Sequence, residues 1–202
     1  MITLDVEQCS DEWLAARAGI PTASCFDKII TSTGKKSTQA KTYMMKLIAE
    51  HFTKEKTSVE QNDWMLRGIE LEEEARDYYK LITDRDVSEV GLIYKDDDKL
   101  VSCSPDGLTG DRGLEIKCPA PHTHVSYLLD GKLPTSYVMQ VQGSMWVSGL
   151  DKWDFLSYHP DFPHLLITVE KDDALHQAMD SFIGEFVKQM LESRAKIKSL
   201  ME

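Results

Sequence analysis

The feature that most constrains this fold is a change of hydrophobic rhythm near residue 85. Between residues 64 and 82 the apolar residues recur mostly at three- and four-residue steps, which is typical of one amphipathic helix. The chain then holds short β-prone runs at 87–94, 100–103 and 114–118, separated by the turn-forming segments DDDK and TGDRG. We therefore expect a helix followed by neighbouring strands of a meander.

Further elements are expected on both sides of this meander. Capping residues and periodicity predict helices at 10–18, from Thr22 or Ser24 to about Ile30, at 38–54, at 134–147, and from Asp172 to about Leu200. Two more strands are expected at 153–158 and 165–169. This order predicts a mixed α/β fold with one central β-sheet flanked by helices.

Composition limits the class of protein. With 202 residues, 42% of them hydrophobic, the chain is expected to form one domain over 1–202 with a sizeable core. No run approaches the ~18 apolar residues of a membrane span, and the N-terminus does not resemble a secretory signal, so we expect a cytoplasmic protein without membrane contact. The four cysteines form no CxxC pair, which argues against a zinc ribbon or a redox motif.

The net charge of −11 argues at first sight against binding nucleic acid, because polyanions are bound by Lys and Arg. The charge is, however, unevenly distributed. Residues 28–49 carry five lysines and no acid, whereas 57–80 carry seven acids against three bases. A basic strip can therefore coexist with an acidic body.

One segment carries a pattern of catalytic type: Ser-Pro-Asp-Gly at 104–107, followed by Leu-Glu-Ile-Lys-Cys-Pro at 114–119. Glu115 and Lys117 alternate on one strand and so share a face, and hairpin pairing can bring Asp106, at the turn end of the preceding strand, opposite Glu115. Two close carboxylates favour Mg²⁺ or Mn²⁺, and Lys117 can position or deprotonate a water. The pattern predicts phosphodiester hydrolysis; the alternative is an ordinary hairpin with a surface ion pair.

These motifs resemble a known family. The SPDG and LEIKCP segments resemble the core of the PD-(D/E)xK nuclease superfamily, which has a restriction-endonuclease-like core. The surrounding chain resembles the lambda-type phage exonucleases, the YqaJ-like viral recombinase nucleases. Three further segments carry this resemblance in the family's order: Trp13–Ser24, Gly68–Ala75 and Tyr137–Trp146.

The resemblance implies a role for each matching residue. Asp106, Glu115 and the backbone carbonyl of Ile116 would bind metal, and Lys117 would act on the attacking water. Glu72 would complete the acidic cluster directly or through water, with Glu70 as a rival, and Gln140 would hydrogen-bond within the site unless it is a surface amide. Two Mg²⁺ ions are implied, and Mn²⁺ can substitute for them.

The resemblance also implies a DNA-end site in an N-terminal helical part over about 1–60. Arg17 would bind a 5′-terminal phosphate with its forked guanidinium, unless it forms a surface salt bridge, and Ser24 would add a hydroxyl. Trp13 would lie near the DNA end or else belong to the core. Lys35 and Lys36, in the loop around Gly34, would contact the duplex backbone.

The function implied is metal-dependent 5′-to-3′ exonuclease activity on double-stranded DNA in phage recombination, releasing 5′-mononucleotides and leaving 3′ single strands for annealing. The family is also known for homotrimeric rings around DNA, which would confine the basic surface to a channel, and for a single-strand annealing partner.

Two other functions remain open. A structure-specific or restriction-type endonuclease of the same superfamily would share Asp106, Glu115 and Lys117 but would not need Arg17. A non-catalytic acidic DNA mimic or interaction protein would explain the charge of −11 and leave the motif a coincidence. His122 and His124 lack further nearby zinc ligands, so we expect structural or solvent-exposed roles for them.

Overall fold

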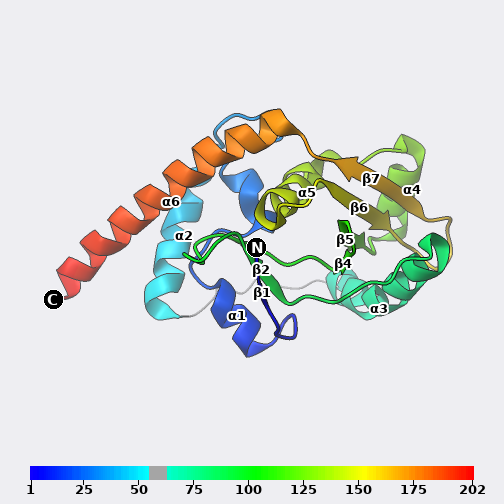
Figure 1. Ribbon diagram of the computed structural model, residues 1–202, viewed down its shortest axis with the longest axis horizontal. Coiled ribbons are helices and arrows are strands. Elements are labelled where there is room, and N and C mark those ends of the chain that lie inside the picture. Colours follow the sequence, from blue (N-terminus) through cyan, green and yellow to red (C-terminus); the bar gives the residue numbers. More distant parts are fainter. Residues whose placement is uncertain (55–62) are drawn as a thin grey trace.

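The structure is a computed structural model that describes residues 1–54 and 63–202 (Figure 1). Its elements, in chain order, are β1 (Ile2–Leu4), α1 (Asp11–Arg17), the 3₁₀ helix η1 (Ala23–Lys28), α2 (Ala40–Thr53), α3 (Asp63–Thr83), β2 (Leu92–Tyr94), β3 (Ser102–Cys103), β4 (Gly107–Thr109), β5 (Arg112–Lys117), α4 (Pro121–Asp130), α5 (Thr135–Ser148), β6 (Lys152–Ser157), β7 (Leu165–Glu170) and α6 (Asp173–Met201). The predicted mixed α/β class is confirmed. The end of the N-terminal part expected over about 1–60 lies outside the described residues.

The strands form two sheets, where we expected one. β1, β2 and β3 make an antiparallel sheet, and the second sheet has the order β4-β5-β6-β7 with β5 and β6 parallel. The division falls between β3 and β4, at Ser104-Pro105-Asp106. Pro105 has no N–H to donate to a ladder, and the N–H of Asp106 already donates to the Leu114 carbonyl at 3.0 Å. The chain therefore leaves the first sheet and enters the second next to the expected site.

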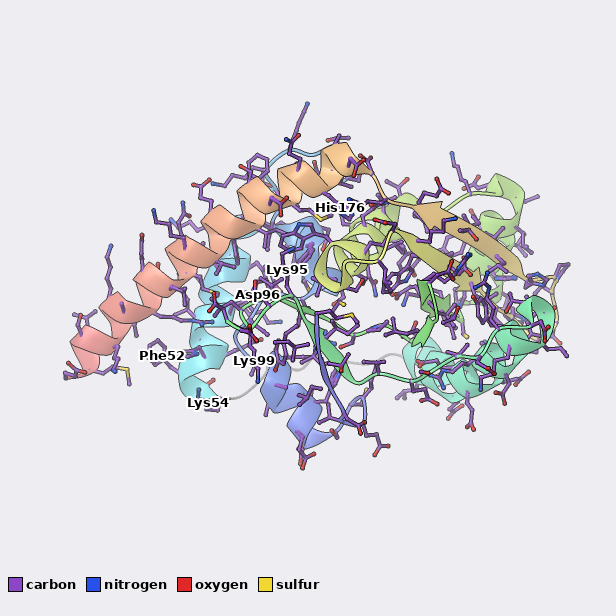
Figure 2. The ribbon with its side chains drawn as sticks, viewed as in Figure 1. Phe52, Lys54, Lys95, Asp96, Lys99 and His176 are labelled. Carbon is purple, nitrogen blue, oxygen red and sulfur yellow. The ribbon has the colours of Figure 1, made fainter. Side chains whose placement is uncertain are left out.

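Locally encoded features agree with expectation. The Ser10 hydroxyl caps α1 by accepting from the Trp13 N–H at 3.2 Å, and Asp172 caps α6 by accepting from Leu175 at 3.0 Å. The DDDK turn is also present: the Lys99 N–H donates to the Asp96 carbonyl at 3.2 Å, and Figure 2 shows both residues there.

Helix α5 lies at the centre of the molecule (Figure 1). It is buried from Val141 to Ser148, and it packs on η1, on both sheets and on α6. Gly143 permits α5 to lie close to η1, because a Cβ atom at Gly143 would lie 2.5 Å from Cδ2 of Phe26 in η1. Since α5 also carries Gln140, this packing places the later family motif beside β5.

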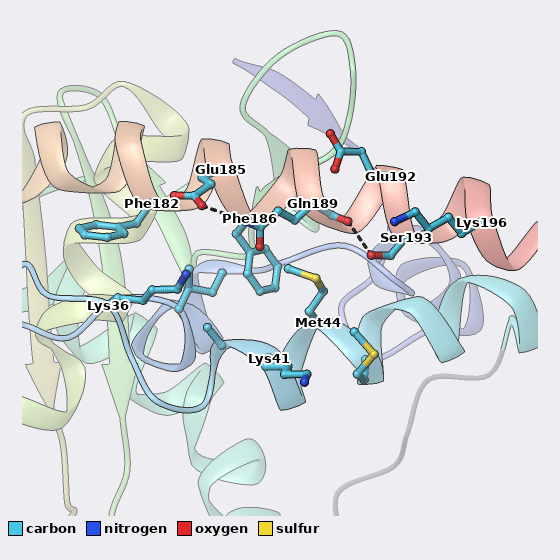
Figure 3. Close-up of a pocket in the computed structure, with 13 residues that line it drawn as sticks. Lys36, Lys41, Met44, Phe182, Glu185, Phe186, Gln189, Glu192, Ser193 and Lys196 are labelled. Carbon is cyan, nitrogen blue, oxygen red and sulfur yellow. Dashed lines mark hydrogen bonds between the residues drawn. The ribbon is translucent and has the colours of Figure 1, made fainter.

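Helix α6 runs along α2 and continues past it to Met201 (Figure 1). Phe186 of α6 stacks on Tyr43 of α2 with ring centroids 5.9 Å apart. A groove of about 400 Å³ lies at this junction, and Figure 3 shows Phe182, Phe186 and Met44 among its lining residues. Within 1–54 and 63–202, no helix combines the length and the hydropathy needed to cross a bilayer.

Candidate active site

Asp106 and Glu115 meet across the β4–β5 hairpin. The register pairs Gly107 with Leu114, which places Asp106 opposite Glu115. Oδ2 of Asp106 also accepts a hydrogen bond from the Ile116 N–H at 2.6 Å, so the carboxylate is turned toward β5. The expected convergence is present. The expectation that Asp106 lies at the turn end of the preceding strand is wrong, because Asp106 directly precedes the short strand β4. A glycine-led strand of three residues has too little β propensity to be recognised from the sequence.

Glu115 is 1% exposed, on a strand with neighbours on both sides. Its Oε1 accepts hydrogen bonds from Nζ of Lys117 and from Nε2 of Gln140, the latter at 2.5 Å. Its Oε2 is also buried and has no hydrogen-bond partner among the described residues. A buried carboxylate oxygen without a donor is costly, and a cation is one of the groups that satisfy it.

Lys117 lies on the same face of β5 as Glu115, as the alternation predicts. Its Nζ lies 5.5 Å from the centroid of the Tyr137 ring. Burial lowers the pKa of Lys117, but the carboxylates of Glu115 and Asp106 outweigh that effect, and the pKa lies above its ordinary value. The ammonium group is thus held as a charged donor between two acids and an aromatic ring.

Glu72, and not Glu70, reaches the site from α3. Glu70 is exposed, whereas Glu72 is half-buried and accepts a hydrogen bond from Nη2 of Arg76 at 2.8 Å. Arg76 also donates from Nε to the Asp106 carbonyl at 3.1 Å, so it links α3 to the hairpin. Burial, followed by repulsion from Asp106, raises the pKa of Glu72 to about 7. Sequence reasoning missed Arg76, although its position one turn after Glu72 is the spacing of a helical ion pair.

The carboxylate oxygens at this site suit a divalent cation. Burial and the neighbouring Asp106 raise the pKa of Glu115 to about 7, although Lys117 opposes them, and a bound cation would relieve both effects. Across the described parts of the chain, no three acidic, His or Cys side chains are grouped closely enough to hold a metal by themselves. The arrangement therefore fits two carboxylates completed by a backbone carbonyl and water, which Mg²⁺ accepts readily.

The site opens to a cleft of about 590 Å³. Glu72 and Asp106 lie in its wall, together with Arg76, Glu89 and the segment 5–9. Gln8 in this segment donates to the Pro105 carbonyl at 2.8 Å, which ties the N-terminal strand region to the SPDG motif. This wall was not predicted, because only the tertiary structure brings residues 5–9 to the motif.

Arg17 forms a second polar cluster beside the carboxylates. It is 9% exposed, and Nη1 donates to Oγ of Ser104 at 2.9 Å, while Nη2 makes longer contacts of 3.4 Å with the hydroxyls of Thr22 and Ser24. Ser104 precedes Asp106 by two residues, so the two clusters adjoin. The expected pairing of Arg17 with Ser24 is present, and Thr22 and Ser104 are additions that sequence reasoning missed.

The environment of Arg17 differs from a surface salt bridge. No carboxylate in the described residues pairs with it, its Nε is buried without a hydrogen-bond partner, and burial lowers its pKa. The guanidinium stacks on Trp13 at 4.0 Å from the ring centroid. Trp13 is itself 9% exposed and donates to the Gly91 carbonyl at 2.8 Å, so it is a core residue that supports Arg17.

The remaining predicted residues lie outside these clusters. Lys35 and Lys36 are exposed in the loop after η1, and Lys36 lines the α2–α6 groove (Figure 3). His122 is exposed at the start of α4. His124 is buried, with ring nitrogens 2.7 Å from Oγ of Ser157 and 2.9 Å from the Pro163 carbonyl, so its role is structural.

Comparisons with known proteins identify the family of this chain. The model of the YqaJ-like viral recombinase domain matches residues 12–151. The structure resembles the alkaline exonuclease LHK-Exo of Laribacter hongkongensis, with a TM-score of 0.84 and 34% identity, covering 95% of this chain and 98% of that one. LHK-Exo in complex with dAMP gives a TM-score of 0.78 and 34% identity, covering 95% of this chain and 100% of that one.

Two curated relatives are more distant. The uncharacterized protein ExoD of Escherichia coli K12 is 31% identical over 68 residues, which is 32% of this chain and 78% of ExoD. Protein R354 of Acanthamoeba polyphaga mimivirus is 27% identical over 164 residues, 74% of this chain, but the match spans only 29% of R354. The family model covers more than half of the chain and the fold match nearly all of it, so this chain belongs to the YqaJ-like viral recombinase family and is a phage-type DNA exonuclease.

Proposed function

We propose that this exonuclease degrades double-stranded DNA from a 5′ end, releases 5′-mononucleotides and leaves a 3′ single strand for annealing-type recombination. The observation that carries the proposal is the juxtaposition of two sites. The Asp106–Glu115 pair suits phosphodiester hydrolysis, and the buried Arg17 beside it has no carboxylate partner in the described residues. The complex of LHK-Exo with dAMP supports the release of mononucleotides.

We further propose that Asp106, Glu115 and the Ile116 carbonyl hold Mg²⁺, with Glu72 acting directly or through water. Two ions are expected, and Mn²⁺ would substitute. When bound, such ions orient a water toward phosphorus and offset the charge on the leaving 3′ oxygen. Gln140 keeps Oε1 of Glu115 occupied, which leaves Oε2 as the oxygen available to a cation.

Lys117 acts on the water and on the scissile phosphate. Its ammonium group is anchored by Glu115, and it offers further N–H donors to an oxygen in the site. Its charge also stabilises the additional negative charge that develops on phosphorus oxygens during attack. We assign it the tasks of holding the nucleophile and stabilising the transition state.

Arg17 reads the 5′-terminal phosphate in this proposal. A guanidinium binds two phosphate oxygens at once, and the hydroxyls of Thr22, Ser24 and Ser104 surround it as additional donors. Burial removes competing water, so the free energy gained from an anion is larger here than at the surface. Lys35 and Lys36 would then contact the duplex backbone farther from the end.

The proposal extends to assembly. Residues 1–202 would act as one nuclease domain, with the DNA-end site in the N-terminal part. Three copies would form a ring around the duplex, and a single-strand annealing protein would receive the exposed 3′ strand. Both the trimeric ring and the annealing partner are proposed from the family resemblance, with double-stranded DNA as the substrate.

The test uses linear duplexes with 5′-phosphate or 5′-hydroxyl ends, together with covalently closed circular DNA, each with Mg²⁺ or with chelator. We expect fast, Mg²⁺-dependent loss of the 5′-phosphorylated linear duplex, with mononucleotides as products. Cutting of the closed circle would instead indicate an endonuclease. Absence of cleavage on every substrate would support the non-catalytic alternative.

A further inference from the structure

Gly19 forms the turn between the two elements that supply the Arg17 cluster. Arg17 ends α1, while Thr22 occupies the N-cap position of η1 and Ser24 lies within it. Gly19 has a φ of +79°, a left-handed conformation, and a Cβ atom built there would lie 3.0 Å from the His51 Cα. The geometry of this turn therefore sets how α1 and η1 are oriented toward each other.

Two buried charged side chains hold the peptide groups of Gly19. Its N–H donates to Oε2 of Glu50, on α2, at 3.2 Å, and its carbonyl accepts from Nη2 of Arg194, on α6. Glu50 is 3% exposed and Arg194 is 8% exposed. These partners are 31 and 175 residues away in the sequence, so the turn is held by two helices of the main body.

Burying the guanidinium of Arg194 costs folding free energy. Its Nε is buried without a hydrogen-bond partner among the described residues, and its second Nη2 contact is with the thioether of Met190 at 3.4 Å. Burial also lowers the pKa of Arg194. An apolar side chain of similar volume would avoid that desolvation cost. The contact that distinguishes arginine here is its hydrogen bond to Gly19.

We propose that Arg194 and Glu50 are positioning residues for recognition of the 5′-phosphate. By holding both peptide groups of Gly19, they fix α1 against η1 and so align the guanidinium of Arg17 with the Thr22 and Ser24 hydroxyls. They touch neither the phosphate nor the Asp106–Glu115 pair. This inference rests on the proposed reading of the 5′-phosphate by Arg17.

The experiment measures kcat and KM on 5′-phosphorylated and 5′-hydroxyl duplexes for matched variants. Arg194→Met keeps the apolar contacts of the side chain and removes the hydrogen bond to Gly19. We expect it to reduce the preference for the 5′-phosphate about tenfold, through a higher KM on that substrate, with unchanged kinetics on 5′-hydroxyl ends. Arg194→Lys retains a donor and should recover part of the preference.

Variants of Glu50 provide an independent test, because Glu50 accepts the hydrogen bond from the Gly19 N–H. Glu50→Ala should reduce the phosphate preference as Arg194→Met does, whereas Glu50→Gln keeps an acceptor and should remain near wild type. Lys188→Met, at an exposed position of α6, is the control for loss of a positive charge on that helix. Circular dichroism and thermal unfolding establish that each variant is folded. If Arg194→Met does not fold, the conservative variants Arg194→Lys and Glu50→Gln carry the test of the positioning role.

The outcomes separate this inference from the proposed function. If the wild-type enzyme shows no preference for the 5′-phosphate, and Arg17→Gln behaves in the same way, then both the reading of the phosphate by Arg17 and the positioning role are overturned. A clear wild-type preference that folded Arg194→Met and Glu50→Ala retain would overturn the positioning role alone. Equal losses on both kinds of end would also overturn it, because they would indicate a general structural role.

Discussion

At the scale of single residues, the site is defined by charges that the fold buries next to one another. Glu115 is 1% exposed yet lies beside Lys117 and opposite Asp106. Removing one member of such a buried group leaves the others uncompensated, so its cost exceeds that of a surface ion pair. An apolar strand would be easier to bury, so these buried charges support the catalytic role proposed for them.

Lys117→Ala tests the chemical role. We expect kcat to fall by a factor of about 10² or more, because a donor to the developing charge is lost. DNA affinity in chelator should change little, since Arg17 and the surface lysines are intact. Single-turnover cleavage and fluorescence anisotropy measure the two quantities, and Lys152→Ala on β6, whose side chain is 45% exposed, is the matched control. Retained turnover would contradict the role given to Lys117.

At the scale of elements, α5 is the helix that joins the packing of the core to the site. It is buried from Val141 to Ser148 against η1, both sheets and α6, and it places Gln140 on Glu115. Its contact with η1 depends on the absence of a side chain at Gly143. The core therefore constrains both walls of the site, the carboxylates through α5 and the Arg17 cluster through η1.

Two helical glycines allow a matched test of this packing. Gly143→Ala places a methyl group 2.5 Å from Phe26, and we expect a loss of about 1–3 kcal/mol in unfolding free energy from overpacking. Gly184→Ala, in α6, meets nothing within 4 Å and should stabilise by about 0.5–1 kcal/mol through helix propensity. Urea unfolding measures both changes, and equal effects of the two substitutions would refute the packing argument.

At the scale of the whole molecule, the net charge of −11 must be reconciled with a polyanionic substrate. The basic groups assigned to DNA lie in the N-terminal part, whereas acids line the cleft at Glu72 and Asp106. In a closed ring, only the inner surface would need to be basic, and an acidic outer surface would keep the particle soluble.

The oligomeric state tests this explanation. We expect light scattering coupled to size-exclusion chromatography to give three times the 23.0 kDa mass of one chain. Measurement with and without a duplex shows whether DNA is required for assembly. A monomer under both conditions would remove the ring as the reason for the acidic surface.

Much of the fold was predictable, because its signals are local. Ser10 and Asp172 were recognised as caps from adjacent residues, and the long helices α2, α3 and α6 follow from their periodicity. Strands β1 and β4 were missed, since each has only three residues: β1 pairs with β2, far away in the sequence, and β4 begins with a glycine and lies in a short hairpin with β5. Helix α4 was also missed; its start at Pro121, in a proline-containing segment, resembles a loop.

The sequence by itself determined the identity and spacing of Asp106, Glu115 and Lys117, on which the proposed chemistry rests, and the alternation that puts the last two on one face. The tertiary structure decided which other residues join them. It selected Glu72 over Glu70, brought Ser104 to Arg17 across 87 positions, and placed Arg194 on Gly19 across 175. The physical reason is that periodicity and capping act between neighbours in the chain, whereas burial and hydrogen bonding act between neighbours in space.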